Sequence, residues 1–213
     1  KKDKYNNVNS SNLIKLFYNK KQNADASVKI SLTNSDNKIN SNEFEKFILI
    51  KNFNLPDQDI TFSSENNLSF NLTKNNKIKN FVAKSNIKTD NTLINLKSQR
   101  VKKYFSNFKN QVNFSQSNFD IDFSENKFNL SLKSKYSINN INENIILTVE
   151  KKNNNYSFEI DVDLDSAEIQ IAELDYIKDK DVKSKLYVNG LYKNNNEITI
   201  KNLKFEEEEK NIF

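Results

Sequence analysis

The sequence of 213 residues contains no cysteine, histidine, methionine or tryptophan, and it has one glycine, Gly190, and one proline, Pro56. Without cysteine the chain can form no disulfide and offers no thiolate, and without histidine it has no imidazole base or metal ligand. A single glycine cannot build the glycine-rich loops that hold phosphate groups in nucleotide-binding enzymes. These absences exclude most familiar enzyme chemistry, and we expect a protein that is not an enzyme and uses no cofactor or metal.

The missing methionine also means that the numbered chain does not begin at a translational start. We therefore expect residues 1–213 to be a single β-rich segment of a longer chain. No apolar run approaches the roughly 18 to 20 residues of a membrane-spanning helix, and no signal-peptide core is present. A targeting or anchoring segment is accordingly expected outside this stretch.

Positive charge exceeds negative charge by five, from 33 Lys and Arg against 28 Asp and Glu, and Arg100 is the single arginine. Proteins that read nucleic acids depend on arginine for bidentate and stacking contacts. Here the positive charge is spread over lysines among many asparagines, which is typical of an AT-rich genome. We expect no nucleic-acid partner.

Apolar residues alternate with polar ones along most of the chain, which is the period of a half-buried β-strand. Less regular β-like segments lie at 44–53, 77–87 and 92–96. Asparagine-rich clusters separate the runs, and asparagine tolerates the positive φ that tight turns need where glycine is missing. Connections this short join antiparallel neighbours, so the sequence predicts an all-β fold built as a long antiparallel meander. Among the apolar positions of these alternating runs are Tyr156, Leu164, Ala167, Ile169, Ile171, Leu203 and Phe205.

Two segments show helical spacing instead, and we expect one or two short amphipathic helices that cover part of the sheet. In residues 10–22, Leu13, Leu16 and Phe17 follow the pattern i, i+3, i+4 behind a Ser/Asn cap. After Ser98 a second segment has the pattern i, i+3, i+4, i+7 in Val101, Tyr104, Phe105 and Phe108.

About a dozen strands with apolar residues on one side form a continuous apolar surface, which must be covered. It can close on itself as a dry sandwich or barrel, or it can curl into an open trough or half-barrel occupied by something apolar. The alternating positions give a stripe roughly 13 Å wide, and a lipid tail occupies roughly half of a ~30 Å hydrocarbon core. The dimensions permit either arrangement, and periodicity alone favours the closed core.

The most conspicuous polar pattern is Asp161, Asp163 and Asp165. It resembles the opening of an EF-hand loop, but that loop needs glycine at its sixth position and glutamate at its twelfth. Ser166 and Ala172 occupy these positions, so we interpret the aspartates as a solvated outer strand face. The acidic run 206–209 is likewise interpreted as a charged terminal segment.

Residues 159–205 carry a recognisable pattern in Asp163, Leu164, Asp165, Ala167, Ile169, Ile171, Leu174, Tyr176, Lys178, Leu186, Val188, Gly190, Ile198, Ile200 and Leu203. These residues match a pattern that begins with a strand of the form D-L-T-x-A-x-L-x-L-P, continues through L-x-W-x-K, and ends in two further strands. In this sequence the proline of the pattern is Ala172 and the tryptophan is a tyrosine. The segment thus resembles the AsmA-like family of Gram-negative envelope proteins, which includes the YhdP, AsmA and TamB types.

The resemblance implies a periplasmic protein that is anchored in the inner membrane by a segment outside this stretch. It also implies an apolar groove that carries phospholipid acyl chains between the inner and outer membranes and supports outer-membrane integrity, and it shifts our expectation from a closed core to the trough. The alternative is a non-catalytic extracellular or surface β-sandwich that serves as an adhesive or structural module. The residues expected to contact lipid are Val28, Ile30, Leu32, Leu68, Phe70, Leu72, Phe119, Ile121, Phe123, Phe128, Leu130, Leu132, Ile145, Leu147, Val149, Phe158, Ile160, Val162, Leu186, Val188, Ile198 and Ile200.

Overall fold

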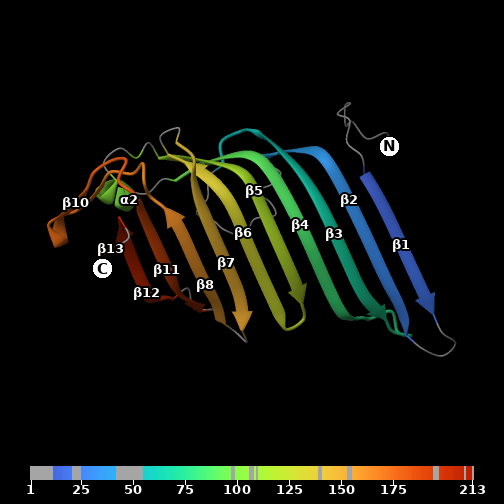
Figure 1. The fold of residues 1–213 in the computed structure, drawn as a ribbon. Helices are drawn as coiled ribbons and strands as arrows, with labels where there is room; N and C mark the ends of the chain where they lie inside the picture. The colour runs from blue at the N-terminus through green and yellow to red at the C-terminus, as the bar shows by residue number, and fades with distance from the viewer. Residues whose placement is uncertain are drawn as a thin grey trace.

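The computed structural model describes residues 12–20, 25–41, 55–96, 99–105, 108, 110–138, 141–152, 155–193, 197–208 and 210–212. These residues form an all-β chain whose main sheet has eleven strands in the order β1-β2-β3-β4-β5-β6-β7-β8-β11-β12-β13 (Figure 1). Two further strands, β9 and β10, pair with each other as a small separate sheet. The bounds are β1 Asn12–Lys20, β2 Ala26–Asn40, β3 Asp59–Leu72, β4 Ile78–Asn95, β5 Gln111–Ser124, β6 Lys127–Ser137, β7 Glu143–Lys152, β8 Asn155–Asp163, β9 Ile169–Ile171, β10 Tyr176–Lys178, β11 Ser184–Lys193, β12 Ile198–Glu207 and β13 Lys210–Asn211.

Every neighbouring pair in the main sheet is antiparallel, and the first eight strands follow one another in sequence order. This confirms the predicted antiparallel meander. One interruption occurs between β8 and β11, where the chain leaves the sheet to form β9 and β10 and then returns beside β8. The expected strand in 44–53 lies outside the described residues.

The main sheet is open, with β1 at one edge and β12 and the short β13 at the other, and it is neither closed nor strongly curled. The described strands therefore do not form the expected half-barrel. Strong curvature needs bulges or glycine kinks placed along a common line. Of the four register shifts, those at 34–37 and 115–118 lie at the same level of the sheet, because Asn37, Phe62, Thr89 and Ser117 are opposite one another in turn, whereas those at 69–71 and 189–190 lie at other levels.

The helix expected in residues 10–22 is wrong, because residues 12–20 form β1. This strand pairs along its whole length with β2, from Asn12 opposite Asn34 to Lys20 opposite Ala26. Its sequence carries a period-two pattern as well as the helical one, and the apolar residues of the period-two pattern, Ile14, Leu16 and Tyr18, lie opposite Leu32, Ile30 and Val28 of β2.

The second expected helix is present but shorter than its pattern. Helix α2 covers Gln99–Tyr104, and Phe105 already forms a β-bridge with Ile169. A single 3₁₀ turn, η1, follows β9 at Ala172–Leu174. Within the described ranges, no helix is long and apolar enough to cross a membrane.

Asparagine and other polar residues occupy the positive-φ positions, as the sequence predicts for a chain with one glycine. Asn76, Asn80 and Asn110 have φ of 55°, 53° and 62°. Gly190 serves a different purpose, because its φ is not positive. A Cβ atom at this position would lie 2.8 Å from Cζ of Phe158 and closer still to the backbone carbonyl oxygen of Thr199.

The strand register gives the sheet two chemically distinct faces, because residues directly opposite each other on paired strands point to the same side. Lysine, asparagine and acidic side chains gather on one side, where Lys127 pairs with Asp122 at 2.9 Å and Lys185 with Asp161 at 3.0 Å. We call this side the polar face. The other side, which we call the apolar face, carries the alternating apolar residues.

Two buried clusters lie at one end of the apolar face. One contains Leu164, Ala167, Ile169 and Phe205, and the other contains Phe108, Val112 and Tyr136. Phe105 packs against both clusters. Among the described residues, the chain that leaves and re-enters the sheet after β8, together with the segment after α2, supplies the cover at this end (Figure 1).

Candidate functional site

All the residues predicted to contact lipid lie on the apolar face. The pairing of each strand with the next places their side chains on the same side of the sheet. The connection runs from Val28 opposite Phe70 on β2 and β3 to Gly190 opposite Ile200 on β11 and β12. The strand pairs place them as follows: Val28, Ile30 and Leu32 on β2; Leu68, Phe70 and Leu72 on β3; Phe119, Ile121 and Phe123 on β5; Phe128, Leu130 and Leu132 on β6; Ile145, Leu147 and Val149 on β7; Phe158, Ile160 and Val162 on β8; Leu186 and Val188 on β11; and Ile198 and Ile200 on β12.

Strand β4 also contributes to the apolar face, and sequence reasoning omitted it. Ala83 lies opposite both Leu68 and Phe123, and Ile87 lies opposite Phe119. The alternation is obscured at the start of β4 because Asn80 adopts a positive φ and shifts the register by one residue.

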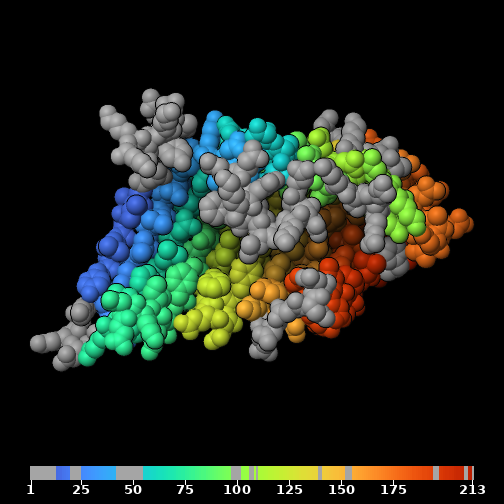
Figure 2. Space-filling model, turned by 180° about the vertical axis from the view of Figure 1, so that it is seen from behind, coloured from blue at the N-terminus to red at the C-terminus, as the bar shows by residue number. Residues whose placement is uncertain are grey.

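Much of the apolar face is accessible. Val28 is the one buried member of the predicted set, and most of the others are half-buried. Phe123, Ile200 and Ile198 are 43%, 50% and 63% exposed. The strands succeed one another from blue to red across the space-filling view from behind (Figure 2). A dry core would have buried these side chains almost completely, so this part of the face is available for contact with another apolar molecule.

A row of aromatic side chains runs along one rim of the apolar face, at the strand ends that lie lowest in Figure 1. Ring centroids are 6.5 Å apart for Phe70 and Phe81, 6.0 Å for Phe81 and Phe123, 6.2 Å for Phe128 and Tyr156, and 6.4 Å for Tyr156 and Tyr192. Phe123 and Phe128 lie directly opposite each other across the β5–β6 hairpin. We call these six residues the aromatic ladder and this edge the ladder rim.

A lysine stands within the aromatic ladder. Lys151 lies between Phe128 and Tyr156 in the register and therefore on the apolar face. Its Nζ lies 6.0 Å from the ring centroid of Tyr156, within the range of a cation–π contact. Sequence reasoning missed the ladder as a unit, although its members all lie a few residues from the ends of their strands.

The opposite end of the apolar face contains an apolar hollow of about 480 Å³. This volume falls within the ~300–1,000 Å³ typical of ligand pockets. Sequence reasoning placed Leu186 among the lipid-contacting residues but not the rest of the lining, half of which comes from segments outside the strands. The hollow is lined by Tyr104, Phe105, Leu164, Ile169, Ile171, Leu174, Leu186, Leu203 and Phe205.

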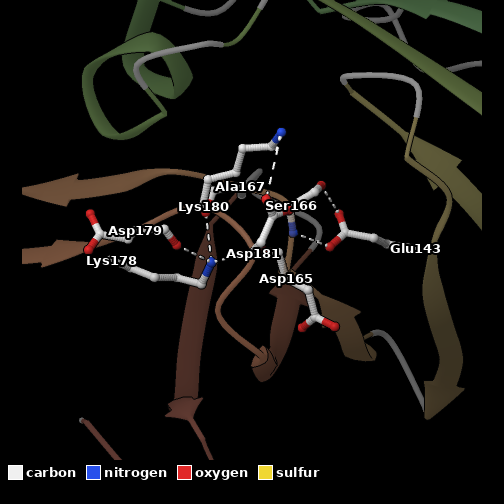
Figure 3. A network of polar contacts seen from close by, with 8 residues as sticks. All are labelled: Glu143, Asp165, Ser166, Ala167, Lys178, Asp179, Lys180 and Asp181. Atoms are coloured by element: carbon white, nitrogen blue, oxygen red, sulfur yellow. Dashed lines mark hydrogen bonds and ion pairs between the residues drawn. The ribbon is translucent and has the colours of Figure 1, made fainter.

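The wall of this hollow is the excursion between β8 and β11, residues 164–183, which we call the cap. Lys178 holds the cap together from a buried position, since only 1% of the residue is exposed (Figure 3). Its Nζ donates hydrogen bonds to the carbonyl oxygens of Ala167 at 2.7 Å, Asp165 at 3.0 Å and Asp179 at 3.0 Å. These contacts use all three donors of the ammonium group. Burial lowers the pKa of Lys178, and the nearby carboxylates, led by Asp165, act in the opposite direction.

Further hydrogen bonds attach the cap to the sheet. The buried carboxylate of Glu143 accepts bonds from the backbone N–H of Ser166 at 2.7 Å and from its hydroxyl at 2.9 Å (Figure 3). Asp165 accepts a bond from the backbone N–H of Ser184 at 2.7 Å. Two residues of the AsmA-like pattern, Asp165 and Lys178, thus hold the cap in place through their side chains.

The three aspartates of the Asp161-x-Asp163-x-Asp165 pattern do not act together. Asp161 pairs with Lys185 and Asp163 accepts a hydrogen bond from Asn144 at 2.7 Å, both on the polar face as expected. Asp165 lies beyond the end of β8 and belongs to the cap, which corrects the expectation of a shared outer face. In the described part of the chain, no three Asp or Glu side chains are grouped to hold a metal ion.

Comparisons with protein-family models, curated proteins and solved structures find no match to this chain. The similarity of residues 159–205 to the AsmA-like pattern therefore rests on the matching residues alone and stays a prediction.

Proposed function

We propose that this chain is part of an inner-membrane-anchored periplasmic lipid-transfer protein, and that its apolar face carries phospholipid acyl chains between the inner and outer membranes. The observation that supports the proposal most is the apolar face itself. It extends in the register from β2 to β12 with few polar interruptions, and many of its side chains remain half-exposed or exposed.

The size of the face suits several lipid tails side by side. The nine strands from β2 to β12 at ~4.8 Å spacing extend over roughly 38 Å, and six residues of one strand span about 20 Å. An acyl chain of one leaflet is about 15 Å long, so it fits along a strand. Each methylene group removed from water contributes about 0.8 kcal/mol, which makes contact with this face favourable for hydrocarbon.

The proposal requires no reaction chemistry, in agreement with the absence of histidine and cysteine. The polar face keeps the sheet in water through its lysines, asparagines and acids. The apolar face acts as the floor of a shallow trough, and the cap forms a wall at one end. In the alternative function, an adhesive β-sandwich, a second sheet would cover the apolar face, whereas the described strands place β9 and β10 at one end of it.

Mass spectrometry of lipids that copurify with the protein tests the proposal. We expect phospholipid to be recovered with the wild type and its amount to fall several-fold when Ile160 on the apolar face is replaced by aspartate. Asp161→Asn on the polar face of the same strand is the matched control and should retain lipid. A folded wild-type protein that binds no phospholipid would refute the proposal.

A further inference from the structure

We propose that the aromatic ladder, with Lys151, marks the headgroup level of the bound phospholipid, and that the acyl chains run along β8, β11 and β12 so that their methyl ends enter the apolar hollow under the cap. This inference rests on the proposed function and adds the orientation of the lipid on the sheet.

The ladder rim has the chemistry of a membrane interface. Aromatic side chains, above all tyrosine, concentrate where hydrocarbon meets headgroups because their rings are apolar and their hydroxyls are polar. Tyr156 and Tyr192 supply such rings at the ends of β8 and β11. Lys151 places a cation among them on the apolar face, where it can form a charge-assisted hydrogen bond with a phosphate.

The charges at the two ends of the strands favour the same orientation. The sequence around the strand ends at the ladder rim, in segments 73–79, 124–128, 150–156 and 192–198, contains seven lysines and three glutamates. The cap at 164–183 contains six acidic residues and three lysines. A phosphate is therefore attracted to the ladder rim and repelled from the cap, and because most of these charges are exposed, the difference is largest at low salt.

Between the two ends, the side chains on the apolar face are hydrocarbon. From Tyr156 the strand β8 presents Phe158, Ile160 and Val162, and the distance from Tyr156 to Val162 is about 20 Å at ~3.3 Å per residue. Leu203 and Phe205 continue the same surface on β12. An acyl chain of about 15 Å that starts near the ladder rim therefore ends close to the hollow.

The lining of the hollow suits the methyl end of a chain and not a headgroup. Eight of its nine residues are leucine, isoleucine or phenylalanine, and the ninth is Tyr104. A phosphate or glycerol placed there would lose its hydrogen bonds to water without gaining replacements. Leu174 and Leu203 at the hollow are 60% and 51% exposed, so a hydrocarbon chain has apolar surface to cover.

Because the chain has no tryptophan, single-tryptophan variants report on the lipid without background. We choose Tyr192→Trp at the ladder and Leu203→Trp at the hollow, with Tyr187→Trp on the polar face as control. The probes are phosphatidylglycerols with bromine on the acyl chain, either near the ester linkage or near the terminal methyl. Bromine quenches tryptophan fluorescence on close contact.

We expect Tyr192→Trp to be quenched at least twofold more by lipid brominated near the ester, and Leu203→Trp at least twofold more by lipid brominated near the methyl. Tyr187→Trp should be quenched by neither. The reverse order, or equal quenching by both lipids at both positions, would overturn the orientation even if mass spectrometry shows bound lipid. Absence of bound lipid would overturn the proposed function as well. Tyr156→Trp replaces Tyr192→Trp if the latter fails to fold.

A charge variant gives a second readout. Lys151→Gln should weaken the affinity for phosphatidylglycerol about fivefold, which is the effect of losing one partly exposed ion pair. Lys84→Gln on the polar face should leave the affinity unchanged. Equal affinities of the wild type and Lys151→Gln would contradict the placement of the phosphate.

Discussion

The Nζ atom of Lys178 lies 2.7 Å from the backbone carbonyl oxygen of Ala167, a residue eleven positions earlier in the chain. This contact, with two similar ones to Asp165 and Asp179, folds the cap into a closed loop over the end of the apolar face. Because Lys178 donates these hydrogen bonds to backbone carbonyl oxygens, no partner side chain in the sequence indicates its role.

Removal of this lysine should loosen the cap. In Lys178→Met three carbonyl oxygens lose their donor in a buried site, and we expect the free energy of unfolding to fall by about 2–3 kcal/mol. Urea denaturation measures the change. Lys180→Met is the control, because Lys180 is exposed and lies 3.9 Å from Asp181 in a loose ion pair, so its loss should cost less than about 0.5 kcal/mol. Equal stabilities of both variants would contradict the role given to Lys178.

Tyr136 should make the stability sensitive to alkaline pH. Its hydroxyl donates a hydrogen bond to the carbonyl oxygen of Asp163, and burial, followed by the nearby Glu143, raises its pKa above the ordinary value of 10.0. Because the raised pKa belongs to the folded state, the stabilisation is complete below about pH 10 and is lost as the pH rises further, when the unfolded chain releases the proton.

Comparison of the wild type with Tyr136→Phe tests this dependence. In urea denaturation at about pH 8 the wild type should be more stable by roughly 1 kcal/mol, and above about pH 11 the difference should shrink or reverse. A difference that stays constant over this interval would mean that the pKa of Tyr136 is the same in the folded and unfolded states, which would contradict this account.

Gly190 should not tolerate a side chain. In Gly190→Ala the new Cβ would lie 2.8 Å from Cζ of Phe158 and even nearer to the backbone of Thr199, which cannot move without disturbing the β11–β12 pairing. We expect a loss of about 1–3 kcal/mol, measured by thermal or urea unfolding. The neighbouring Asn189→Ala, on the polar face, should cost less than about 1 kcal/mol. A stable Gly190→Ala variant would show that the strands separate easily at this point.

Lipid transport should depend on the face that a side chain occupies. Phe158→Asp places a charge on the apolar face, and we expect transfer of fluorescent phospholipid between vesicles to slow several-fold, because an acyl chain cannot cover a charge without large cost. Asp163→Asn on the polar face of the same strand removes a charge and should leave the rate within about twofold. Equal slowing by both substitutions would count against the assigned facing.

The period-two pattern predicted most of the sheet because it reflects local geometry. Runs such as Phe158, Ile160 and Val162 alternate along the chain, and the register then places them together with their neighbours on one face. The same reasoning failed for residues 10–22, where Leu13, Leu16 and Phe17 fit a helix while Ile14, Leu16 and Tyr18 fit a strand. Pairing with β2 decides between these patterns, and that pairing is tertiary information.

The ladder, the hollow and the cap depend on which strands become neighbours, so the sequence could not reveal them. Tyr156 and Tyr192 are far apart in sequence and meet because β11 returns beside β8. The burial of Lys178 depends on the closure of the cap, whereas its residue type alone predicts an exposed charge. The overall curvature likewise depends on where the register shifts fall relative to one another.

Photo-crosslinking with a phospholipid that carries a diazirine in its acyl chain tests the central claim most directly. After illumination, mass spectrometry of peptides locates the labelled residues on one face of the sheet or the other. We predict labels on apolar-face residues of neighbouring strands, such as Leu147, Ile160 and Val188, and none on Thr148, Asp161 or Tyr187, which alternate with them on the polar face. Labels distributed equally over both faces, or no labels on the folded protein, would contradict the claim that the apolar face carries acyl chains.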